Sequence, residues 1–207
     1  MDDSREFDVC EGEKMSGVNT AEYWDGMWNK HHWKNRTIEI SPDEEELLTS
    51  VNFMGPVLGL GMGDGKWLSL VSAPSNAYNL DISSVAIESC RKIGINGKVF
   101  EMKEGNPFPL PNESVAVIVA LNSLEHLSKK DAIYVLKECR RVLKKFGKMI
   151  IEWPDPSFKC SEHEYELPEE DVKDIFKDWD IIKLDHKGSV WYIQLMKGGD
   201  FLWTQQS

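Results

Sequence analysis

Short apolar runs alternate with helical patterns through the middle of the chain, and this alternation constrains the fold more than any other feature. Apolar runs of strand length occur at residues 57–60, 77–80, 99–102, 115–121 and 148–153. Helical patterns separate most of these runs, at residues 66–71, 84–92 and 129–143. Strands that alternate with helices form parallel sheets with helices on both faces. The sequence therefore predicts a doubly wound α/β fold, a three-layer α/β/α sandwich.

The C-terminal part follows a different pattern. A helical stretch at residues 169–177 precedes two strand-like runs, at 181–185 and 190–196, and only residues 186–189 separate these two runs. A link of hairpin length forces antiparallel pairing. We therefore expect a mostly parallel seven-stranded sheet that ends in a C-terminal antiparallel hairpin.

The N-terminal part lies outside this alternation. Residues 1–17 are acidic and lack apolar periodicity, so we expect a mobile leader there. Thr20 is a suitable N-cap for a helix rich in aromatic residues, and Ser41 with Glu44 has the pattern of a capping box at a second helix. The prediction is one domain over residues 18–207, in which residues 18–54 form a helical lid.

Size and composition limit the classes of function. A chain of 207 residues is long enough for one α/β domain and too short for two ordinary ones. The net charge of −11 works against a nucleic-acid partner. No apolar run approaches the roughly 18 residues of a membrane span, and the N-terminus lacks a signal pattern. We expect a cytoplasmic monomer or weak dimer with no membrane partner, and free cysteines rather than disulfides.

One glycine-rich motif carries the chemistry. Gly61-Met62-Gly63-Asp64-Gly65 links the first strand to a helix, where glycines let the backbone approach a ligand and free N–H groups favour an anion. Asp81 ends the second strand 20 residues after Gly61, at the spacing where an acid meets ribose hydroxyls. These features favour a nucleoside cofactor. A purely structural turn and a nicotinamide-dependent oxidoreductase are the alternatives, although Lys66 stands where the nicotinamide pattern has its third glycine.

Residues 57–65 resemble the first motif of class I (Rossmann-like) S-adenosylmethionine-dependent methyltransferases. Further stretches are similar to the ribose, adenine, post-strand-four and pre-strand-five segments of that family: 79–83, 104–114, 122–127 and 140–148. The likeness covers about residues 55–153. Two positions depart from the family pattern: Gly59 stands where an acidic residue is usual, and Lys145-Phe146-Gly147 stands where Pro-Gly-Gly is usual.

The resemblance implies S-adenosylmethionine as methyl donor and S-adenosylhomocysteine as product. Asp81 would bind the ribose hydroxyls, Glu104 would accept from the adenine amino group, and the sulfonium would lie between the glycine turn and the end of the fourth strand. The cofactor-binding residues implied in this way are Gly61, Met62, Gly63, Gly65, Asp81, Ile82, Glu104, Gly105, Asn106, Leu121 and Asn122.

The acceptor is expected to enter beneath the N-terminal aromatic helix and the loop at residues 154–168. His126 is the candidate proton acceptor, with a packing role as the alternative. Tyr23, Trp24, Trp28 and Trp153 are candidates for the lid and the substrate lining, with core packing as the alternative. We expect no metal site, because His31-His32 and Cys160 with His163 lack a second ligand pair at zinc-site spacing.

The expected function is methyl transfer to a small-molecule acceptor. Attack on a sulfonium needs alignment and a desolvated pocket more than a strong acid or base, which agrees with a sequence that has no obvious catalytic dyad or triad. The acidic composition favours a neutral or cationic acceptor over a phosphate-rich one. Two alternatives stay open: a methyltransferase-like protein that binds the cofactor without turnover, suggested by Gly59, and a protein-lysine methyltransferase.

Overall fold

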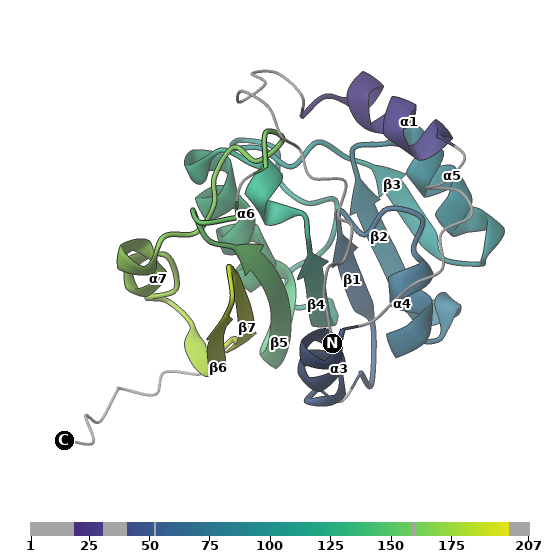
Figure 1. The fold of residues 1–207 in the computed structure, drawn as a ribbon. Helices are drawn as coiled ribbons and strands as arrows, with labels where there is room; N and C mark the ends of the chain where they lie inside the picture. Colours follow the sequence, from purple (N-terminus) through teal and green to yellow (C-terminus); the bar gives the residue numbers. More distant parts are fainter. Residues whose placement is uncertain (1–18, 31–40, 52, 159, 199–207) are drawn as a thin grey trace.

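The computed structural model describes residues 19–30, 41–51, 53–158 and 160–198. Its seven-stranded sheet has the order β3-β2-β1-β4-β5-β7-β6 (Figure 1). The strands are β1 (Val57–Leu60), β2 (Ala77–Asp81), β3 (Asn96–Val99), β4 (Val115–Leu121), β5 (Leu143–Pro154), β6 (Asp180–Lys187) and β7 (Val190–Met196). Pairing is parallel from β3 to β5 along the sheet, and β7 pairs antiparallel with both β5 and β6. The predicted mostly parallel sheet with a C-terminal hairpin is confirmed.

Helices cover both faces of the sheet (Figure 1). One core cluster joins the sheet to α6 (Lys129–Val142) and α7 (Glu169–Ile175). The other joins the opposite face to α3 (Pro42–Thr49), α4 (Lys66–Val71) and α5 (Ser84–Lys92). From Val117 to Leu121, successive β4 residues alternate between the two clusters, as a strand buried on both faces requires. The three-layer prediction is confirmed.

The third strand differs from the predicted range. The apolar run at residues 99–102 suggested its position, but β3 pairs with β2 from Asn96 to Val99. Three of its four residues are exposed, because this strand lies at the edge of the sheet. Apolarity therefore does not mark it. Phe100, the first residue after β3, donates its N–H to the Asp81 carbonyl at 2.8 Å.

The N-terminal helix α1 (Ala21–Asn29) lies across the carboxyl ends of the parallel strands, beside α5 (Figure 1). The Thr20 side chain caps it by accepting from the Tyr23 N–H, and Ser41 and Glu44 form the predicted capping box at α3. The leader predicted at 1–17 lies outside the described residues. Within the described residues, no helix combines the length and apolarity needed to cross a membrane.

Candidate cofactor site and acceptor side

The glycine turn connects β1 to α4 at the carboxyl edge of the sheet. Gly61, Gly63 and Gly65 have φ angles of 62°, 55° and 76°, a region that L-residues rarely adopt. A Cβ on Gly61 would lie 2.7 Å from the Ser123 Cβ, and one on Gly63 would lie 2.0 Å from the Trp28 ring. The turn therefore requires glycine both for its conformation and for its close neighbours.

Asp81 ends β2 with its carboxylate against this turn. Its Oδ2 accepts from the Gly63 N–H at 3.0 Å, and its Oδ1 accepts from the Ser83 N–H at 2.8 Å. Burial raises the pKa of Asp81 to about 6, although these two hydrogen bonds act in the opposite direction. Each carboxylate oxygen has a second lone pair. The position and charge of Asp81 therefore fit a ligand that offers hydroxyl donors, such as a ribose.

A buried amide that sequence reasoning missed supports the turn from within the sheet. Asn79 accepts from the Met62 N–H at 3.3 Å and donates to the Gly63 carbonyl at 3.0 Å. A Cβ on Gly59 would lie 3.0 Å from the Asn79 Oδ1 and 2.6 Å from Leu68. Gly59, the departure from the family pattern, thus leaves the space that the Asn79 amide uses. No local sequence pattern distinguishes Asn79 from other polar residues of a strand, so the sequence does not predict that it supports the turn.

Ser123 adds a buried hydroxyl next to Gly61, just after the end of β4. Its Oγ has no hydrogen-bond partner among the described residues. An unsatisfied buried hydroxyl is costly, so a polar group of a ligand above the turn would stabilise it. Together with the glycine cradle and the Asp81 carboxylate, this atom makes the site fit S-adenosylmethionine.

The other predicted cofactor residues are placed less directly. The side chains of Met62 and Leu121 are buried in the core, so only their backbone is available at the turn. Glu104 forms an ion pair with Lys130. Gly105 has a φ of 78°, and Asn106 donates to the Glu101 carbonyl at 2.8 Å. Two further predicted positions are partly or fully exposed at the ends of β2 and β4: Ile82 and Asn122.

The start of α4 is less open to an anion than expected. Asp64 accepts from the Lys66 N–H at 3.2 Å, and its other oxygen pairs with the Lys66 Nζ at 3.0 Å. The expectation of free N–H groups there is wrong in this respect, because the chain supplies its own carboxylate.

Asp25, another residue that sequence reasoning missed, anchors α1 to the start of α5. Its carboxylate accepts from the Ser83 and Ser84 hydroxyls at 2.5 and 2.9 Å and from the Val85 N–H at 3.2 Å. Partial burial acts to raise the pKa of Asp25, but these hydrogen bonds lower it below its ordinary value. The anchor positions Trp28 of the same helix on Gly63.

On the side where we expect the acceptor to enter, called the acceptor side below, the loop at residues 155–168 lies against η2 (Leu124–His126), a short 3₁₀ helix after β4. The N–H groups of Glu164 and Tyr165 donate to the Glu125 carbonyl at 2.9 and 3.1 Å. The loop also meets α1, since the Tyr23 hydroxyl donates to the Glu162 carboxylate. Three elements from distant parts of the sequence therefore meet beside the glycine turn.

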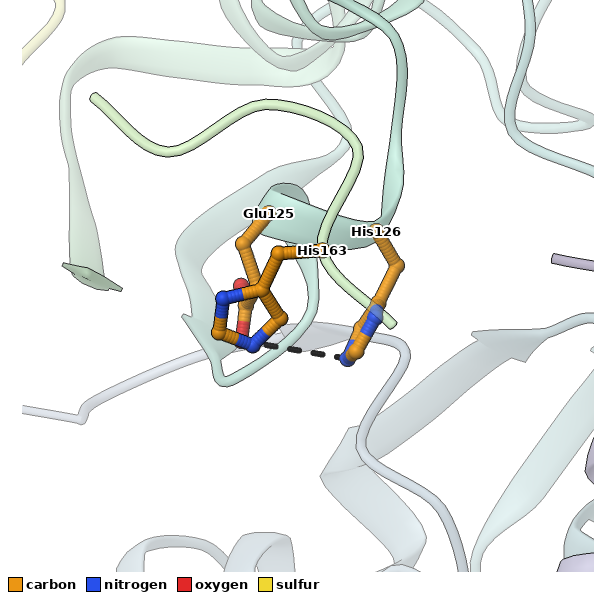
Figure 2. Close-up of side chains that lie close together, drawn as sticks. All are labelled: Glu125, His126 and His163. Atoms are coloured by element: carbon orange, nitrogen blue, oxygen red, sulfur yellow. Dashed lines mark ion pairs between the residues drawn. The ribbon is translucent and has the colours of Figure 1, made fainter. Parts of the chain in front are cut away.

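His126 lies where these three elements meet. Its ring contacts Trp24 of α1 edge to face, with 4.8 Å between centroids, and its Nδ1 lies 3.2 Å from the Glu162 carbonyl. Burial lowers the pKa of His126, so the imidazole is neutral near pH 7. Figure 2 shows it beside Glu125 and His163. Burial raises the pKa of Glu125 to about 8.

Trp153 does not lie where a substrate-lining residue would. Its side chain is 0% exposed, and its indole N–H donates to the Tyr165 carbonyl at 3.0 Å. The expected lining role does not fit this position, because the ring belongs to the core beneath α7. Tyr23, Trp24 and Trp28, in contrast, all lie on α1 over the strand ends.

A family model for a methyltransferase domain matches residues 58–151. The fold is similar to that of a SAM-dependent methyltransferase from Aquifex aeolicus (21% identity, TM-score 0.60, 84% of this chain and 97% of that one). It is also similar to the N-methyltransferase NodS from Bradyrhizobium japonicum WM9 in complex with S-adenosylhomocysteine (14% identity, TM-score 0.65, 86% and 98%). A further structural neighbour is magnesium protoporphyrin IX methyltransferase from Synechocystis PCC 6803 (12% identity, TM-score 0.61, 86% of this chain and 97% of that one). No curated protein matches the sequence.

The matched residues run from β1 to β5 and include the glycine turn, Asp81 and η2. Residues 58–151 therefore match a methyltransferase domain, and the fold is similar to that of solved methyltransferases, which supports a class I S-adenosylmethionine-dependent methyltransferase. The nicotinamide alternative is set aside by this match. The structural neighbours support the fold, and they differ among themselves in what they methylate.

Proposed function

We propose that the protein transfers a methyl group from S-adenosylmethionine to a small, neutral or cationic acceptor. The observation that carries this proposal is the cover over the strand ends: α1 lies on the glycine turn through Trp28 and meets the 155–168 loop through Tyr23 and Glu162. Segments that enclose a site in this way suit a molecule small enough to be surrounded. The carboxylate of Glu162 and the net charge of −11 favour an acceptor without negative charge.

In this proposal, the residues of the site bind and align rather than react. Asp81 accepts from the ribose hydroxyls, the backbone at Gly61 and Gly63 supports the methionine part, and Ser123 contacts a polar group of the donor. Methyl transfer then requires an acceptor in line with the sulfonium and exclusion of water. The helix α1 is proposed to supply that exclusion as a lid.

His126 is the proposed proton acceptor for an acceptor hydroxyl or amine. Its Nδ1 faces the Glu162 carbonyl, which favours the tautomer with the proton on Nδ1 and the lone pair on Nε2. The lowered pKa of His126 keeps this lone pair available near pH 7. A conservative His126→Gln variant should lower kcat and remove an acidic limb from its pH profile, with cofactor affinity retained.

The test of the function is to find where the methyl group goes. The full chain would be incubated with methyl-labelled S-adenosylmethionine and a cell extract separated into low-molecular-mass and protein fractions. Label in the low-molecular-mass fraction, reduced in Asp81→Ala, is the expected result. Label confined to lysines of the protein fraction would favour a protein-lysine methyltransferase. Cofactor binding by calorimetry without transfer to either fraction would favour a protein that binds without turnover.

A further inference from the structure

We propose that Glu125, His126 and His163 form a binding site for one divalent transition-metal ion of the Zn²⁺ type. The first two residues come from η2 and the third from the 155–168 loop, and their side chains converge in Figure 2. One carboxylate oxygen and one ring nitrogen from each histidine all lie within 4.8 Å of one another. Two imidazoles and a carboxylate are a ligand set that holds Zn²⁺ and leaves a coordination position open.

The surroundings of the two rings match those of metal-binding histidines. A ligating histidine usually directs its second ring nitrogen to a carbonyl or carboxylate, which sets the tautomer. The Nδ1 of His126 lies 3.2 Å from the Glu162 carbonyl, and its Nε2 lies 3.9 Å from the Glu125 carboxylate. The Nδ1 of His163 lies 3.9 Å from the Glu166 carboxylate. The outer nitrogen of His126 thus lies within hydrogen-bond distance of an oxygen, whereas the outer nitrogen of His163 faces a carboxylate from beyond that distance.

Glu125 supplies independent evidence for a ligand. The residue is 1% exposed, and its Oε2 has no hydrogen-bond partner among the described residues. A buried carboxyl oxygen without a hydrogen-bond partner is unfavourable, and a cation between the three side chains would satisfy it. The Glu125 carbonyl, in contrast, accepts from two N–H groups of the loop, so the backbone that carries this carboxylate is held in place.

Aromatic contacts hold both rings from the outside. Phe158 stacks on His163 with 5.5 Å between centroids and 18° between planes, and Trp24 contacts His126 edge to face. Ligand atoms around Zn²⁺ lie roughly 3.4 Å apart at the usual metal–ligand distances. Small side-chain rotations inward from the present separations are therefore sufficient.

No local spacing in the sequence predicts this site, because its ligands are not close together along the chain. Cys160 with His163 lacked a second pair, whereas His126 and His163 meet only after folding brings the loop onto η2. The ion and a substrate proton would use the same Nε2 lone pair of His126. His126 can therefore act as the proposed proton acceptor only in the ion-free protein. The metal proposal is tested by ion binding alone, independently of methyl transfer.

The experiment titrates the chelator-treated full chain with ZnCl₂ by calorimetry and with CoCl₂ by visible spectroscopy. We expect one equivalent of Zn²⁺ to bind and Co²⁺ to give d–d bands typical of four or five nitrogen and oxygen ligands. Glu125→Gln, His126→Ala and His163→Ala should each weaken Zn²⁺ binding at least about tenfold. Glu125→Gln changes no volume, so it stays informative if a histidine variant fails to fold.

Three controls test other possible ligands. His186→Ala removes a histidine that pairs with Asp155 outside the cluster, Cys160→Ser removes the nearby thiol, and a His31→Ala/His32→Ala variant covers two histidines outside the described residues. All three should bind one equivalent with unchanged affinity. Absence of binding by the wild-type chain, unchanged binding in Glu125→Gln, or loss of binding in any of the three controls would overturn the proposal.

Discussion

The cofactor side and the acceptor side of the site are built from different kinds of structure. The cofactor side consists of a backbone turn and a strand end between Gly61 and Asp81, and a buried amide supports it from within the sheet. The acceptor side consists of α1, η2 and the 155–168 loop, which meet through hydrogen bonds and ring contacts between segments far apart in the sequence. In our proposal, a half built mainly from backbone binds the cofactor, and a half built mainly from side chains covers it.

The two halves also differ in burial. Trp28 is the only buried residue of α1, and no α1 residue belongs to either core cluster of the described chain. Segments with few buried apolar contacts open at low free-energy cost. We therefore expect substitutions on the cofactor side to cause the larger losses of cofactor affinity. Substitutions on the acceptor side should weaken cofactor binding only in part.

The largest effect is expected at Gly63. Gly63→Val should abolish cofactor binding, because any side chain there needs an unfavourable φ and meets the Trp28 ring 2.0 Å from its Cβ. Calorimetry with S-adenosylhomocysteine measures the loss, and circular dichroism checks that the variant is folded. Gly188→Ala is the matched control, since this glycine also has a positive φ of 60° but no neighbour within 4 Å of an added Cβ.

A double variant separates two causes of that loss. Gly63→Ala combined with Trp28→Ala removes the clash with the Trp28 ring and leaves the unfavourable φ of residue 63 and its contact with the cofactor. If binding returns to the level of Trp28→Ala alone, the turn itself does not touch the cofactor and our assignment of the site is wrong.

Removal of the lid should have the next largest effect. Deleting residues 1–34 should cancel turnover and weaken cofactor binding without unfolding the sheet, because both core clusters stay complete. Deleting residues 1–17 is the matched control and should leave turnover and cofactor affinity nearly unchanged. Full turnover by the longer deletion would show that α1 is not needed to exclude water.

Asp81→Ala tests the cofactor side at a single side chain. Hydrogen bonds to charged groups contribute about 1.5 to 3 kcal/mol, so the affinity for S-adenosylhomocysteine should fall about ten- to a hundredfold. Glu88→Ala on the exposed face of α5 is the control and should bind as the wild type does. Near-unchanged affinity in Asp81→Ala would refute the ribose assignment.

The raised pKa of Asp81 predicts a pH effect with a defined sign. Its pKa of about 6 lies above the ordinary 3.8, so ionised Asp81 destabilises the unliganded fold, and stability from this group falls as pH rises through about 6. Cofactor affinity should change in the opposite direction, since hydroxyl donors bind the ionised form. We expect about tenfold weaker binding at pH 5 than at pH 7, which follows from one titrating group. Asp81→Asn should flatten this dependence.

The same division explains what the sequence could predict. The glycine turn and Asp81 lie within one strand-turn-helix-strand unit, where spacing along the chain determines proximity in space. The pairing of Asp25 with α5 and of Tyr23 with Glu162 depends on how distant segments meet, and no local pattern encodes it. The bounds of the edge strand β3 were predicted wrongly for another reason. An exposed strand needs few apolar residues, so the apolar run at residues 99–102 lies beside β3 and does not mark it.

The smallest effect should come from loosening the lid without removing it. Asp25→Ala removes the three hydrogen bonds that anchor α1 to α5 but leaves Trp28 on the turn, so cofactor affinity should fall only a few-fold. Limited trypsin cleavage at exposed Lys30 reports the lid directly. S-adenosylhomocysteine should slow this cleavage in the wild type and protect less in Asp25→Ala. Glu22→Ala, an exposed acid of the same helix, should match the wild type. Equal wild-type cleavage with and without ligand would show that α1 is not coupled to the cofactor, and the two sides would then act independently.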